Sequence, residues 1–212
     1  MLADLPLQRY RKGGEGMSTT NIILCGVGGQ GTVLASKLTA AASMAKGLDV
    51  RSAETIGMAQ RGGSVLSYLR IGECSTPLIQ SGCADIIIGF EPAETVRALS
   101  YLKKGGVVIT SDRAMMPVTA ALQGSDYEGA KMTDFLKSLE GDLIGKLVIV
   151  NTDQALADLG SAKVMNMVLL GAAARGGFLG EVTIDDIKQA LVKKVKPQFH
   201  ELNFKALEYA SV

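Results

Sequence analysis

Several residue types that carry chemistry are scarce in this chain of 212 residues. It has three cysteines, one histidine, no tryptophan and only 5% aromatic residues. Cys25, Cys74 and Cys83 lie far apart and form no C-x-x-C pair, so the ligand spacing of an iron–sulfur or zinc site is missing. We therefore expect no metal site and no catalytic residue in this chain. Cys25, at the end of an apolar stretch, is expected to be a small buried hydrophobe.

Charge and apolar runs exclude further classes of protein. The 22 basic and 21 acidic residues leave a net charge of +1, which offers no field for nucleic acid or for a membrane surface. No apolar run reaches the roughly 18 residues of a membrane span. Asp4, Arg9 and Lys12 stand where a signal peptide has its apolar core. We expect a cytoplasmic protein with no nucleic-acid or membrane partner, and the hydrophobic content of 47% allows a sizeable core.

The order of the apolar segments predicts one α/β domain. Residues 1–17 are polar and glycine-bearing and end at a possible alternative start, Met17, so we expect a flexible extension (an ordered arm is the alternative) followed by a domain over residues 18–212. Alternating strands and helices are typical of a three-layer Rossmann-like sandwich with a mostly parallel sheet. Residues 64–71 follow the preceding strand too closely for a helical crossover, so part of the sheet is expected to be antiparallel. The expected strands are 22–25, 49–53, 64–71, 84–90, 107–110 and 147–151. The expected helices are 32–46, 92–102 (closed by Gly105 and Gly106), 162–174, one capped by Thr183 and one beginning at Pro197.

Residues 22–31, Ile-Ile-Leu-Cys-Gly-Val-Gly-Gly-Gln-Gly, are the most informative part of the sequence. An apolar strand ends in glycines with the G-x-G-x-x-G spacing, and an alanine-rich helix follows. Glycine lets the backbone come close to a ligand, and N–H groups at a helix start can face an anion. A tight turn that packs a helix on a sheet without a ligand is the alternative. The candidate binding residues are Gly26, Gly28, Gly29, Gln30, Gly31 and Thr32.

A conventional dinucleotide site is not expected. Such a site needs an acidic residue about 20 residues after the glycines, at the end of the second strand. Asp49 lies at the start of the expected second strand, and Glu54 lies beyond its end beside a loop. The sequence therefore disfavours a nicotinamide or flavin cofactor.

A second glycine-rich segment, residues 54–64, follows the second strand. Ligands of open α/β sheets bind at the carboxyl ends of strands, so we expect this loop at the same sheet edge as the first one. Arg61 beside Gly62 and Gly63 offers a guanidinium together with backbone N–H groups, which suits a phosphate or a carboxylate. The alternative is a solvated arginine in a turn.

Three other polar residues stand among apolar ones. Glu91 ends a buried strand, and we interpret it as the cap of the helix that begins at Pro92 rather than as a site residue. Asn166 lies inside an apolar helix and is expected to satisfy a buried carbonyl, with a partner contact as the alternative. His200 has no serine or cysteine partner motif, so it is not expected to be catalytic.

These segments together resemble a known family. The first glycine motif followed by Gly57-Met-Ala-Gln-Arg-Gly-Gly-Ser-Val65 is similar to the gamma-type domain of 2-oxoacid:ferredoxin oxidoreductases. The Met-Ala-Gln-Arg-Gly-Gly form resembles most closely the small beta subunit of the indolepyruvate branch. Further similar segments lie at 90–92, 163–172 and 200–206, so the resemblance covers about residues 20–210.

The resemblance implies a subunit rather than a complete enzyme. Members convert a 2-oxoacid and coenzyme A to acyl-CoA and carbon dioxide and pass electrons to ferredoxin. In the indolepyruvate type, which acts on aryl pyruvates, a large alpha subunit holds thiamine diphosphate, magnesium and [4Fe–4S] clusters. We therefore expect a cofactor-free chain in an alpha2beta2 complex, whose glycine loops meet coenzyme A phosphates or shape a subunit contact. A free-standing Rossmann-like protein that binds a nucleotide itself is the second hypothesis.

Overall fold

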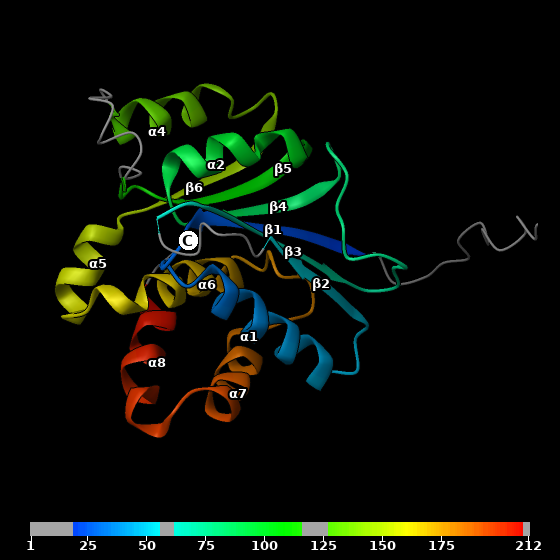
Figure 1. The fold of residues 1–212 in the computed structure, drawn as a ribbon, viewed down its shortest axis with the longest axis vertical. Coiled ribbons are helices and arrows are strands. Elements are labelled where there is room, and N and C mark those ends of the chain that lie inside the picture. Colours follow the sequence, from blue (N-terminus) through cyan, green and yellow to red (C-terminus); the bar gives the residue numbers. More distant parts are fainter. Residues whose placement is uncertain (1–18, 56–61, 116–126, 210–212) are drawn as a thin grey trace, which may run out of the picture.

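The sheet stands in the middle of a three-layer α/β sandwich (Figure 1). The computed structural model describes residues 19–55, 62–115 and 127–209; the expected extension over residues 1–17 lies outside them. Six strands follow the order β2-β3-β1-β4-β5-β6. They are β1 (Thr20–Val27), β2 (Val50–Glu54), β3 (Ser64–Ile71), β4 (Ala84–Gly89), β5 (Leu102–Ser111) and β6 (Ile144–Val150).

The sheet is mixed, as the short connection before β3 predicts. β1, β4, β5 and β6 are parallel, whereas β3 is antiparallel to both β1 and β2. Because β3 runs against both of its neighbours, β1 and β2 point in the same direction and end at the same edge. The expected α/β fold with a mostly parallel sheet is confirmed, and the antiparallel part is β3.

Helices cover both faces of the sheet (Figure 1). One face carries α2 (Pro92–Ala98) and α4 (Gly129–Ser138). The other carries α1 (Thr32–Ala45) and α6 (Met165–Arg175). Farther from the sheet, α7 (Ile184–Lys194) packs against α1, and α5 (Thr152–Leu159) and α8 (His200–Tyr209) pack against α6. Since α1 and α2 leave the neighbouring strands β1 and β4 toward opposite faces, the topological switch point of the sheet lies between these two strands.

Alternation along the central strands divides the core into two clusters. Ile22 and Leu24 face α1 and α6, whereas Ile23 and Cys25 face α2. Cys25 is 1% exposed, which confirms the expected buried hydrophobe, and burial raises the pKa of its thiol above the ordinary value. Nearly every side chain of α6 is buried, as its all-round apolar sequence predicts.

Two sequence expectations about this half of the chain are wrong. The helix after Glu91 ends at Ala98, and a short 3-10 turn leads directly into β5 at Leu102. Gly105 and Gly106 lie inside β5 rather than closing a helix, and a side chain on Gly106 would come within 3.0 Å of the Asp85 carbonyl oxygen. Close backbone approach, rather than a helix end, therefore explains this glycine.

Candidate functional site

The two glycine loops meet at the carboxyl edge of β1. The Gly28 N–H donates to the Gly63 carbonyl at 2.8 Å, and the Gly62 N–H donates to the Gly28 carbonyl at 3.3 Å. These bonds continue the β1–β3 ladder beyond its last pair, Val27 and Ser64. The expectation that both loops share one sheet edge is therefore confirmed for Gly62 and Gly63, while Arg61 lies outside the described residues.

The first loop delivers the chain into α1 with open backbone donors. Gly29 and Gly31 have φ angles of +104° and +87°, a left-handed conformation that favours glycine. Gly31 is the N-cap of α1 and supplies no side-chain cap. Among the described residues, nothing accepts a hydrogen bond from the N–H groups of Thr32, Val33 or Leu34. Backbone N–H groups without an acceptor at a helix start favour the binding of an anion.

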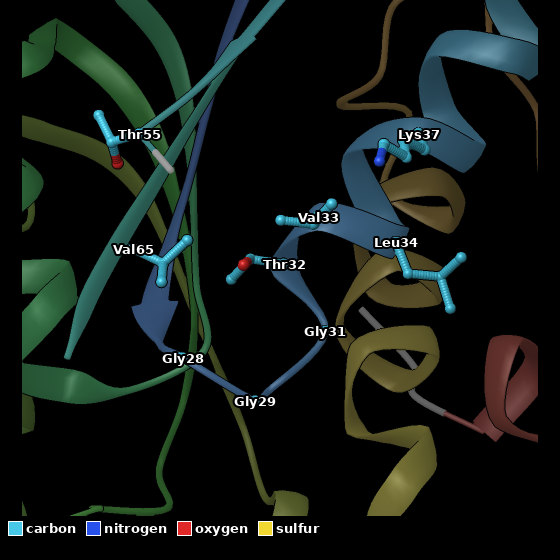
Figure 2. A pocket seen from close by; sticks show the side chains of 9 residues that line it. All are labelled: Gly28, Gly29, Gly31, Thr32, Val33, Leu34, Lys37, Thr55 and Val65. Atoms are coloured by element: carbon cyan, nitrogen blue, oxygen red, sulfur yellow. The ribbon is translucent and has the colours of Figure 1, made fainter. Parts of the chain in front are cut away.

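A pocket of about 500 Å³ lies between α1 and β3, against the first loop. Figure 2 shows Thr32 and Val33 directed from the helix start toward Val65, with Lys37 one turn farther along α1. The lining combines apolar side chains, glycine backbone and one cationic side chain. The lining residues are Gly28, Gly29, Gly31, Thr32, Val33, Leu34, Lys37, Thr55 and Val65.

Gln30 lies on the opposite side of the loop, at the switch point. Gln30 is only 9% exposed. Its Oε1 accepts from the Val27 N–H at 2.6 Å, and its Nε2 donates to the Phe90 carbonyl at 3.1 Å. A Cβ on Gly26 would come within 2.7 Å of Gln30 Oε1. The space between the ends of β1 and β4, where doubly wound sheets receive a dinucleotide, is therefore occupied by this amide.

Asn166 holds the loop from the third side. From α6, its Nδ2 donates to the Gly31 carbonyl at 3.4 Å, and a Cβ on Gly31 would come within 2.6 Å of that nitrogen. Asn166 therefore donates to a backbone carbonyl, as expected, although Gly31 is only partly buried. Gly31 is needed here for two reasons, its positive φ and the close approach of this amide.

Comparison with known proteins gives the family. The model of the family described as pyruvate ferredoxin/flavodoxin oxidoreductase matches residues 21–211. The chain belongs to this family. It is 35% identical to the indolepyruvate oxidoreductase subunit IorB of Thermococcus kodakarensis, over 91% of this chain and 94% of that protein. The common gamma subunit of pyruvate/ketoisovalerate oxidoreductases from the same organism is 26% identical, over 87% of this chain and 91% of that protein.

A solved structure supports the same family. The keto/oxoacid ferredoxin oxidoreductase gamma subunit of Geobacter sulfurreducens is 25% identical and superposes with a TM-score of 0.61, covering 89% of this chain and 94% of that one. The family that the glycine motifs indicated is thus confirmed. This chain is a small, gamma-type subunit of a 2-oxoacid:ferredoxin oxidoreductase. The hypothesis of a free-standing nucleotide-binding protein gives way to it.

Glu91 caps a helix and also accepts hydrogen bonds from other segments of the chain. Its Oε2 accepts from the Glu94 N–H at 3.0 Å, which confirms the expected cap of α2. Its Oε1 accepts from the Met115 N–H at 3.4 Å and from the hydroxyl of Tyr127. Burial and the hydrogen bond to Glu91 raise the pKa of Tyr127 above its ordinary value. Glu94 in turn accepts from the Ser64 hydroxyl at 2.6 Å, so α2 also supports the second loop.

The predicted site residues divide into two groups. Gly28, Gly29, Gly31 and Thr32 line the pocket, whereas Gly26, Gln30, Gly62 and Gly63 lie beneath or beside it. The sequence analysis missed the pocket residues Val33, Leu34, Lys37, Thr55 and Val65. Lys37 could have been found, because it lies four residues after Val33 and so on the same face of the expected helix.

His200 is remote from the pocket. It lies at the start of α8, and its Nε2 is 2.7 Å from the Val195 carbonyl. Residues 19–55, 62–115 and 127–209 contain no group of three or more His, Cys, Asp or Glu side chains able to hold a metal ion. No helix in those same ranges is long and apolar enough to cross a membrane.

Proposed function

We propose that this chain is the small subunit of an oxidoreductase that acts on indolepyruvate or another aryl 2-oxoacid. The complex would decarboxylate the 2-oxoacid oxidatively, form an acyl-CoA and pass electrons to ferredoxin. The greater similarity to the indolepyruvate subunit than to the pyruvate/ketoisovalerate subunit of one organism supports this branch. The Met-Ala-Gln-Arg-Gly-Gly segment at residues 58–63, which resembles that branch most closely, agrees with it.

The partner we propose is a large alpha subunit in an alpha2beta2 assembly. Thiamine diphosphate with magnesium would supply the carbanion chemistry there, and [4Fe–4S] clusters would carry the electrons. The described residues of this chain offer no cluster of His, Cys, Asp or Glu side chains that could hold a metal ion. We place the complex in the cytoplasm, where ferredoxin is reduced and thiols such as Cys25 stay reduced.

The role we propose for this chain is to bind the phosphate end of coenzyme A in the pocket beside α1. The observation that carries this role is the set of open N–H groups at Thr32, Val33 and Leu34, at a pocket that Lys37 also lines. An anion gains from both the helix start and the cation. The apolar lining residues Val33, Leu34 and Val65 suit the less polar remainder of the ligand. A partner segment seated in the pocket is the second candidate, since Leu34 is 36% exposed there.

Substrate preference tests the proposed branch. The complex of this chain with its large subunit is expected to reduce a viologen dye with kcat/KM at least 10-fold higher for indolepyruvate than for pyruvate, at saturating coenzyme A. A difference of this size corresponds to about 1.4 kcal/mol of transition-state binding, which burial of an indole ring readily supplies. Equal values for the two substrates, or a preference for pyruvate, would remove the indolepyruvate assignment and leave the subunit class intact.

Substitution of two cationic side chains tests the proposed binding of coenzyme A. Lys37→Ala and Arg61→Ala are each expected to raise the KM for coenzyme A by about 10- to 150-fold, since loss of one charge-assisted contact costs roughly 1.5–3 kcal/mol. Lys146→Ala, an exposed lysine on the edge strand β6, is the matched control and should leave that KM unchanged. Weaker assembly with normal kinetics of the remaining complex would instead favour the partner segment. Unchanged assembly and unchanged KM in both variants would reject both roles for the pocket.

A further inference from the structure

The switch point of this sheet is closed by a side chain of the loop itself. We propose that Gln30 is a positioning residue, which fixes the first glycine loop so that the open N–H groups of α1 face the pocket on the β3 side. The part of this proposal that concerns coenzyme A rests on the proposed function. The part that concerns the loop rests on geometry alone.

Gln30 connects the loop to two strands at once. Its backbone N–H donates to the Val27 carbonyl at 3.1 Å, and its Oε1 accepts from the Val27 N–H at 2.6 Å, so the turn is closed twice. Nε2 then reaches the Phe90 carbonyl directly after β4. An amide suits this position because one atom must accept and the other must donate, and a glutamine does both without changing charge.

The two side-chain hydrogen bonds of Gln30 are important for stability because the side chain is buried. Gln30 is only 9% exposed, and a buried amide that loses its partners destabilises the folded state because water cannot replace them. Gly26 and Gln30 form a matched pair, because a Cβ on Gly26 would come within 2.7 Å of Gln30 Oε1 and 2.8 Å of Phe90 Cβ. The missing side chain at Gly26 is therefore what admits the amide between β1 and β4.

Three contacts thus hold the loop, each from a different direction. Gly28 is bonded to Gly63 beside β3, Gly31 is held by Asn166 of α6, and Gln30 is bonded to Phe90 beside β4. The Gln30 contact is the one that also fills the crevice used by dinucleotides. Among the described residues, a pocket between α1 and β3 gives an approach to the helix start on the other side of the loop (Figure 2).

Gln30→Met, assayed in the complex with the large subunit, tests this role. Methionine keeps the length and volume but makes neither hydrogen bond. We expect amide hydrogen exchange in the peptide spanning residues 22–35 to become at least 10-fold faster. We also expect the KM for coenzyme A to rise about 10-fold, with kcat at saturating coenzyme A within twofold of the unmodified complex. Gln154→Met, at an exposed glutamine of α5, is the control and should change neither quantity.

A second variant covers the case in which methionine prevents folding. Gln30→Asn keeps the amide but is too short to reach both Val27 and Phe90, so it should shift exchange in the same direction. Unchanged exchange over residues 22–35 in the folded variants overturns the proposal, whatever Lys37→Ala does. Faster exchange with an unchanged KM for coenzyme A supports Gln30 as the residue that fixes the loop and overturns the coenzyme A assignment instead.

Discussion

Mixing this chain with its large subunit is expected to convert an inactive, colourless protein into an active complex. Alone, the chain should reduce no viologen dye with indolepyruvate and coenzyme A. Its three cysteines lack the spacing of an iron–sulfur site, and its described residues contain no metal-ligand cluster. The measurement is dye reduction by each subunit separately and by the reconstituted complex, with added thiamine diphosphate and magnesium.

The outcomes of the reconstitution separate the hypotheses. Activity that appears only in the mixture identifies this chain as a required, non-catalytic subunit. Thiamine-dependent activity from this chain alone would refute the subunit assignment. Full activity from the large subunit alone, unchanged on adding this chain, would show that the pocket beside α1 takes no part in the reaction. A mixture with Lys146→Ala should behave as the unmodified chain does. That lysine lies on the edge strand β6, three strands away from β1, whereas the pocket lies beside β3 on the other side of β1.

The β1–loop–α1 unit could be predicted because its signals are local. An apolar run, three glycines at fixed spacing and a small-residue helix follow one another within residues 22–45. The antiparallel β3 followed from connection length, which is also local. By contrast, α4 begins at Gly129 with no side-chain cap, and α5 is capped by Asn151, which the apolar pattern assigned to the preceding strand. Weak or shared signals of this kind hide short helices.

The sequence could not show which residues of the site line the pocket and which hold the loop in place. Gln30 and Phe90 are 60 residues apart, and Gly31 and Asn166 are 135 apart. Which loop residues face the pocket depends on β4 and α6 lying beside the loop, and that depends on strand order. The motif therefore predicted residues that the fold brings together, while tertiary contacts decide which of them line the pocket and which hold the loop.

Gly171→Ala is expected to be the most destabilising small substitution in the core. In a helix interior alanine is favoured over glycine by about 1 kcal/mol, so propensity alone predicts stabilisation. Here the added Cβ would come within 2.0 Å of the Leu207 carbonyl oxygen and 2.7 Å of its carbonyl carbon, both backbone atoms of α8. Arg175 also donates to that oxygen at 2.8 Å, so moving α8 away strains a second contact. We expect the free energy of unfolding to fall by about 3 kcal/mol.

Thermal unfolding of the isolated chain measures this effect, with Gly160→Ala as the control. A loss of about 3 kcal/mol should lower Tm by roughly 6–12 °C in a chain of this size. Gly160 has φ +67° but open space around its Cβ, so its substitution carries only backbone strain of about 1–2 kcal/mol. A Tm loss for Gly171→Ala no larger than for Gly160→Ala would mean that α6 and α8 separate at little cost. Since α6 also carries Asn166, a displaced α6 should loosen Gly31 as well, and the KM for coenzyme A of any complex that forms should rise.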